Sequence, residues 1–183
     1  MWHQGIFNRT AMYPLLAALT VFFSSSLGQT PKPNLPWVRN VPSNHGVIIF
    51  VHGVTGEERS TWTSDDGHFW PSMLLDDPAF EGENVYVYHY SSPRFGPALT
   101  VDQLADNMRL IFRADGVLRH KEITIVSHSM GGIVTRAFIV KYQQEMASKI
   151  RLLYFFATPS IGHDYAKVMS LISKNPQFKQ LIS

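Results

Sequence analysis

Short apolar runs, separated by polar stretches that contain glycine or proline, mark the middle of this chain as a series of strands. Runs of about four to eight residues rich in β-branched and aromatic side chains are typical of buried strands. Residues 47–51 are uniformly apolar, whereas residues 84–90 alternate valine and tyrosine, as a strand with two different faces does. The pattern predicts four strands, over residues 47–51, 84–90, 122–127 and 151–157.

Between these runs the apolar positions recur with the period of a helix. Apolar residues three and four positions apart predict an amphipathic helix over residues 100–114, with Thr100 or a neighbour as its cap. A second helix is predicted over residues 131–146, with Ile133, Phe138 and Val140 facing inward. Shorter helices are predicted over residues 70–75, 165–172 and 176–182.

The alternation of strands and helices predicts an α/β fold, a mostly parallel sheet with flanking helices and right-handed crossovers. In such sheets ligands bind at the carboxyl ends of the strands. The stretches that follow the predicted strands contain His52, Ser129 and Thr158. Any chemistry of this chain is therefore expected where those stretches meet.

Residues 123–135 read Ile-Thr-Ile-Val-Ser-His-Ser-Met-Gly-Gly-Ile-Val-Thr, a strand followed at once by a helical pattern. A serine in a sharp turn between a strand and a helix is the setting of a nucleophile elbow. Ser129 is the candidate nucleophile, the backbone N–H of Met130 a candidate oxyanion donor, and Gly131 a small residue that lets strand and helix approach. The alternative is a serine that only caps the helix.

Residues 46–56 combine an apolar strand with the sequence His52-Gly53-x-x-Gly56. Glycines allow backbone to come close to a ligand, as a loop that donates an oxyanion N–H must. Val54 is the expected second backbone donor, with His52 and Gly53 in support, and an ordinary turn is the alternative. His52 is expected to hold this loop through hydrogen bonds rather than to act as a base.

Together with the strand end Ala157-Thr158-Pro159, these segments resemble the α/β-hydrolase superfamily, and within it the lipase-like serine esterases. The resemblance spans residues 46–164 and departs from the usual elbow at Ser127, where glycine is common. It implies a partial α/β-hydrolase fold with later strands missing. It also implies a serine hydrolase acting on carboxylic esters or lipids through an acyl-enzyme intermediate, without a cofactor.

The resemblance places the catalytic acid and histidine after the nucleophile in the chain. Asp164 and His163 follow the last predicted strand and are candidates for acid and base, or they begin the helix expected over residues 165–172. His128 is expected to be structural, with its side chain directed away from the Ser129 hydroxyl. No spacing of histidines and carboxylates matches a zinc pattern, so no metal is expected.

Composition narrows the classes of partner. The 183 residues are 45% hydrophobic, carry a net charge of +2 and include no cysteine. This suits one globular domain, and without a basic run no nucleic-acid partner is expected. The expected partner is a small-molecule or lipid ester, with contact to a membrane surface left open and no protein partner inferred. Aromatic residues in the loops indicate either an apolar substrate or core packing: Trp62, Phe69, Trp70 and Phe95.

The amino-terminal residues have the three-part layout of a secretory signal peptide. Arg9 precedes an apolar stretch over residues 11–23, and a tract of small and polar residues follows to position 29. The predicted organisation is a signal peptide over residues 1–28, a proline-rich linker or edge segment over 29–45, and a partial hydrolase domain over 46–183. Export is therefore expected, with a membrane anchor or a mitochondrial presequence as alternatives.

Only 24 residues follow Pro159. The sequence is therefore expected to be a fragment or a truncated product with little esterase turnover of its own. The alternative is a catalytically inactive binding protein that keeps the pocket.

Overall fold

The computed structural model describes residues 34–53, 56–91 and 99–159, and these form a five-stranded sheet in the order β1-β3-β2-β4-β5. Strands β2, β3, β4 and β5 run parallel to one another, and β1 pairs antiparallel with β3 at the edge of the sheet. The fold is α/β, as the sequence predicts. The strands are β1 (Trp37–Arg39), β2 (Gly46–Val51), β3 (Glu83–Tyr88), β4 (Glu122–His128) and β5 (Ile150–Phe156).

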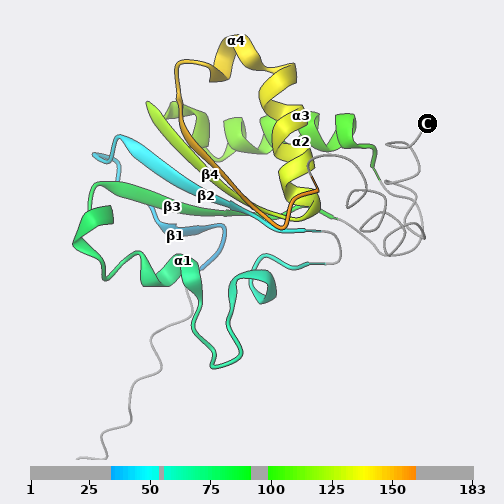
Figure 1. Cartoon of the computed structure of the whole chain (residues 1–183). Coiled ribbons are helices and arrows are strands. Elements are labelled where there is room, and N and C mark those ends of the chain that lie inside the picture. Colours follow the sequence, from blue (N-terminus) through cyan, green and yellow to red (C-terminus); the bar gives the residue numbers. More distant parts are fainter. Residues whose placement is uncertain (1–33, 54–55, 92–98, 160–183) are drawn as a thin grey trace, which may run out of the picture. The chain divides into compact units, whose positions relative to one another are not determined.

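Helices cover both faces of the sheet (Figure 1). Helices α2 (Val101–Ala114) and α3 (Met130–Lys141) pack against each other on one face, and the short α1 (Trp70–Met73) lies on the other. Helix α4 (Gln143–Met146) follows α3. Three single-turn 3-10 helices complete the described elements: η1 (Ser60–Trp62), η2 (Pro78–Phe80) and η3 (Val117–Arg119).

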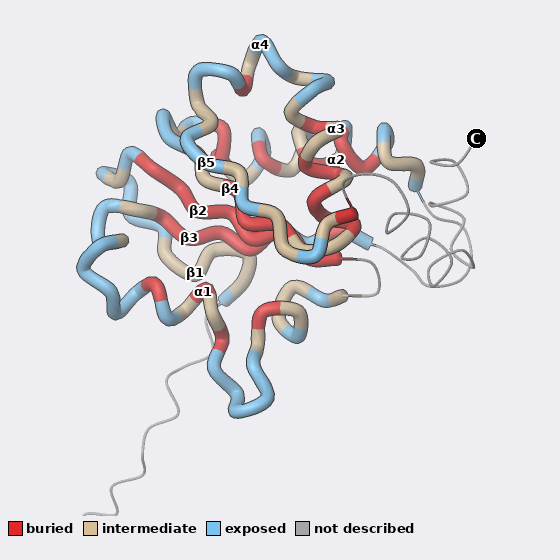
Figure 2. Tube along the Cα trace, in the orientation of Figure 1, coloured by how far each residue is buried: buried red, intermediate tan, exposed pale blue. Residues whose placement is uncertain are grey.

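The central strands are buried on both faces, as Figure 2 shows along β2, β3 and β4. One apolar cluster joins alternate residues of these strands to α2 and α3, and a second joins the opposite residues to η1 and α1. This arrangement explains the continuous apolar run of β2, because a strand covered on both sides needs no polar face. The rigid sheet holds the loops at its carboxyl ends.

Helix α2 begins at the predicted cap. The Thr100 hydroxyl accepts a hydrogen bond from the Gln103 amide at 3.1 Å, and the Gln103 side chain accepts one from the Thr100 amide at 2.9 Å. This reciprocal capping box satisfies two amides that the helix itself cannot bond.

Two sequence expectations are corrected here. The predicted helix over 131–146 is interrupted at Tyr142, which leaves the helical conformation and separates α3 from α4. Val140 was expected to face inward, but it is 75% exposed because it lies on the opposite side of α3 from the buried Phe138.

The segment expected to be a linker or an edge segment contributes β1, a fifth strand that the apolar pattern did not predict. Three half-buried residues are too short a run to stand out by periodicity. Their pairing with β3 depends on that strand having a free edge.

Several expectations fall outside the described residues. These include the signal peptide, the loop residue Phe95, and the helices predicted over residues 165–172 and 176–182. Among the residues that the structure describes, no helix is both long and apolar enough to cross a bilayer.

Candidate active site

The turn between β4 and α3 holds Ser129 in a backbone conformation that L-residues seldom adopt, with φ 51° and ψ −123°. Its amide donates a hydrogen bond to the Phe156 carbonyl of β5 at 2.9 Å, which fixes the turn to the neighbouring strand. The Ser129 side chain makes no capping hydrogen bond to α3. The reading of Ser129 as a simple helix cap therefore does not hold, and its strained backbone is typical of functional turns.

Two glycines allow the chain to close tightly around this turn. A Cβ at Gly131 would lie 2.6 Å from the Val51 carbonyl oxygen and closer still to that of His52. A Cβ at Gly53 would lie 2.9 Å from the Ser129 Cβ. Real Cβ atoms do not come so close to backbone, so β2 and the start of α3 can meet only because these positions are glycine.

Ser127, where the sequence departs from the usual elbow, is fully buried and hydrogen-bonded. Its hydroxyl lies 2.9 Å from that of Thr135, one of the buried residues of α3. The pair links β4 to the helix behind the nucleophile. A larger residue than glycine is thus accommodated because its polar atom has a partner.

His52 is fully buried in a single tautomer. Its Nε2 accepts a hydrogen bond from the Tyr90 amide at 3.4 Å, so its Nδ1 carries the proton and donates to the Gly53 carbonyl at 2.8 Å. Its ring stacks on that of Tyr90, with centroids 4.5 Å apart. Burial lowers the pKa of His52, which keeps the ring neutral. With both nitrogens engaged, His52 supports its loop and is not available as a base.

Three histidines lie level with one another at the carboxyl ends of three adjacent strands. Val51 pairs with both Tyr88 and Ser127, so His52, His89 and His128 each stand one residue beyond that level. Burial lowers the pKa of His128, whose Nδ1 is buried without a hydrogen-bond partner among the described residues. The rim of the site thus carries two neutral imidazoles and the more exposed His89.

His89 forms an ion pair that the sequence analysis did not predict. Its Nδ1 lies 2.7 Å from Oε2 of Glu58, which follows the glycine turn after β2. No spacing rule connects residues so far apart in the chain, although His89 directly follows β3 and Glu58 lies in the loop after β2. The pair becomes visible only in the folded structure.

Three of the loop aromatics pack in the core rather than facing a substrate site. Trp62 and Phe69 are buried in the cluster that includes Phe50, and Trp70 packs against it. Trp62 also lies edge-on to the ring of His128, 6.4 Å between centroids. These three residues belong to the core.

Of the remaining candidate residues, the structure describes Met130 but not the second oxyanion donor or the expected acid and base. Met130 is the first residue of α3, where backbone N–H groups have no partner within the helix, and is 1% exposed. Val54, His163 and Asp164 lie outside the described residues. Within the described part, the site therefore consists of the elbow, the glycine turn and the histidine rim.

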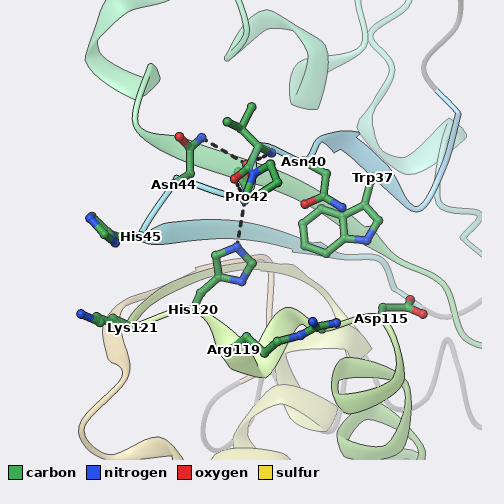
Figure 3. A pocket seen from close by; sticks show the side chains of 12 residues that line it. Trp37, Asn40, Pro42, Asn44, His45, Asp115, Arg119, His120 and Lys121 are labelled. Carbon is green, nitrogen blue, oxygen red and sulfur yellow. Dashed lines mark hydrogen bonds between the residues drawn. The ribbon is translucent and has the colours of Figure 1, made fainter.

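Among the hollows that the described residues form away from Ser129, two differ in chemistry. One, of about 330 Å³, is apolar and lies over the α1 face of β4 and β5, where Leu152 and Tyr154 are about half exposed. The other, of about 420 Å³, is polar and lies at the amino ends of β2 and β4. Figure 3 shows that the side chains of His45 and Lys121 there point to one side and Arg119 to the other.

The family model described as the alpha/beta hydrolase family matches residues 48–176. This chain belongs to that family. No curated protein sequence matches this α/β hydrolase. The five-stranded, mostly parallel sheet with helices agrees with the family assignment.

Solved structures of other proteins are similar to this chain, and the first of those below shows the same fold. Phospholipase PlaB from Legionella pneumophila is 22% identical over 72% of this chain and 29% of its own length, with a TM-score of 0.51. Lipase BlEst2 of Bacillus licheniformis is 21% identical over 71% of this chain and 47% of its own, with a TM-score of 0.44. A carboxylesterase structure from Nitrososphaera gargenis is 14% identical over 75% and 46%, with a TM-score of 0.48. This α/β hydrolase thus spans less than half the length of each.

Proposed function

We propose that this chain carries the nucleophile of a serine ester hydrolase, with Ser129 attacking a carboxylic ester or lipid to form an acyl-enzyme. The observation that carries the proposal is the backbone of Ser129, held at positive φ at the carboxyl end of β4 with no side-chain bond to the helix. A serine held this way costs stability, and such strain persists where the position of the side chain matters.

The surrounding geometry supports acyl transfer. The Ser129 oxygen would bond to the ester carbonyl carbon, and the carbonyl oxygen would become an oxyanion beside the start of α3, where the Met130 amide is the nearest backbone donor in sequence. Collapse of that intermediate breaks the ester C–O bond, and the alcohol leaves with a proton. Water then hydrolyses the acyl-enzyme in the same way.

The reaction also needs a base that takes the Ser129 proton. His52 cannot serve, because both its ring nitrogens are engaged. His163, with Asp164 as its acid, is the proposal for that role. Substrate identity within esters and lipids belongs to the same proposal.

A fluorophosphonate probe tests the nucleophile directly. We expect the full 183-residue chain to be labelled at Ser129, as located by peptide mass spectrometry, and Ser129→Ala to lose the label. Ser60→Ala, a change at an exposed serine in η1, is the matched control and should label like wild type. Equal labelling of Ser129→Ala contradicts the proposal. A folded wild-type chain that takes no label would favour a catalytically inactive binding protein.

A further inference from the structure

The Glu58–His89 ion pair joins the stretch after the glycine turn to the end of β3. His89 directly follows Tyr88, the last residue of β3, and Glu58 comes two residues after Gly56. The Nδ1–Oε2 distance of 2.7 Å is that of a charge-assisted hydrogen bond. Strand β3 is hydrogen-bonded along its length to β2, which leads into the glycine turn. The ion pair therefore connects the residues that follow the turn to the same sheet that holds the residues before it.

The start of this turn is fixed close to the nucleophile. Gly53 packs against the Ser129 Cβ and its carbonyl accepts from His52, as described above. The Gly56 amide donates back to the Gly53 carbonyl at 3.2 Å and closes the turn. A displacement of Gly56 therefore affects the carbonyl of Gly53, the residue that lies beside Ser129.

The far side of the segment is fixed by a buried aromatic residue. Trp62 is 6% exposed and packs edge-on against Phe50, with centroids 5.0 Å apart. The Thr61 amide donates to the Glu57 carbonyl at 3.2 Å, which continues the chain into η1. Glu58 therefore lies between two fixed points, and its ion pair joins it to His89, the residue that follows β3.

The acidic partner of this pair is less exposed than that of a nearby surface pair. The Glu58 and His89 side chains are 33% and 59% exposed, whereas Asp66 and His68, which form an ion pair of 3.0 Å, are 69% and 65% exposed. Burial acts to raise the pKa of Glu58, but hydrogen bonds from its own amide and from His89, with the charge of His89, outweigh it and lower the pKa. The His89 ring also lies 5.7 Å from that of His52.

We propose that the Glu58–His89 pair positions Gly56, and through its hydrogen bond Gly53, against the nucleophile Ser129. The pair acts through the turn and does not touch the reacting atoms, so His89 and Glu58 are positioning residues. The effect of the pair on catalysis rests on the proposed esterase function. Its effect on structure, which is to hold the residues that follow Gly56 in place, does not depend on that function.

Hydrogen exchange measures the structural consequence on the full chain. In His89→Ala we expect faster exchange of the amides of Gly56, Thr61 and Trp62, with exchange in β2 and β4 unchanged. His89→Gln, whose amide can still donate to Glu58, should restore part of the protection. His68→Ala breaks the exposed Asp66–His68 pair and is the matched control. Wild-type exchange in His89→Ala, or an equal change in His68→Ala, overturns the proposal.

The rate of fluorophosphonate labelling measures the catalytic consequence. We expect His89→Ala to label Ser129 about tenfold more slowly, because small displacements of reacting groups have large effects on rate. His89→Gln should lie between, and His68→Ala should match wild type. An unlabelled wild-type chain contradicts the proposed function, whereas unchanged exchange in His89→Ala contradicts the positioning role whatever the labelling shows.

Discussion

At the scale of single residues, two sets of buried polar groups beside the nucleophile are hydrogen-bonded, whereas Nδ1 of His128 has no partner among the described residues. Ser127 and Thr135 share a hydrogen bond behind the nucleophile, and His52 uses both ring nitrogens beside it. Such groups are costly to leave unpaired, because a buried donor or acceptor without a partner keeps its full desolvation penalty. Their hydrogen bonds therefore help to hold the elbow and the start of the glycine turn in place.

Replacing one member of the hydroxyl pair should therefore cost more than replacing both. Thr135→Val keeps the shape of the side chain but leaves the Ser127 hydroxyl buried and unpaired, and we expect the free energy of unfolding to fall by about 1–3 kcal/mol. The double variant Ser127→Ala/Thr135→Val should recover part of that loss. Urea denaturation of wild type, of the single variants Ser127→Ala and Thr135→Val, and of the double variant measures these free energies of unfolding. A double variant less stable than Thr135→Val would show that the pair is not isolated.

The neutral state of His52 predicts a stability that depends on pH. Burial lowers its folded-state pKa, so below about pH 6.5 the unfolded chain binds a proton that the folded chain does not. The free energy of unfolding should be level above that pH and fall as pH drops below it, by at most about 1.4 kcal/mol per pH unit for each such histidine. His128 acts in the same direction.

Denaturation curves between pH 5 and 8 test this dependence. His52→Gln should reduce the slope below about pH 6.5, at a cost in overall stability. A flat profile for the wild-type chain would argue against a buried neutral His52.

At the scale of elements, the decisive contact is the close approach of α3 to the end of β2. Gly131→Ala would drive a Cβ into the carbonyl oxygens of Val51 and His52. We expect a loss of about 1–3 kcal/mol, as for other overpacked sites, together with slower labelling of Ser129. Gly82→Ala is the matched control, since a Cβ there meets nothing within 4 Å. Thermal denaturation compares the two, and equal melting temperatures would contradict the close approach.

At the scale of the whole molecule, the amino-terminal residues predict that the protein is exported. We expect cleavage near Gly28 and Gln29, because a basic residue, an apolar stretch and small residues occur there in order. Mass spectrometry of protein expressed with its natural amino terminus should find a chain that begins near Gln29 in the secreted fraction. Recovery of only the intact chain inside the cell would exclude cleavage at this site.

The sequence by itself determined the features that depend on neighbours along the chain. The strands from 47, 84, 122 and 151, the amphipathic α2 with its cap, and the serine turn between strand and helix were predicted, because periodicity and turn chemistry are local properties. The α/β class and the meeting of loops at the carboxyl ends of the strands follow from their order. The family assignment supports the same elements.

Only the tertiary structure decided the contacts between residues distant in sequence. The addition of β1 depends on a free edge of β3, and the exposure of Val140 depends on which side of α3 meets the sheet. The partner of Ser127, the tautomer of His52 and the pairing of Glu58 with His89 depend on strands and loops that only folding brings together. Hydrogen bonds and burial are set by three-dimensional proximity, which a one-dimensional pattern does not encode.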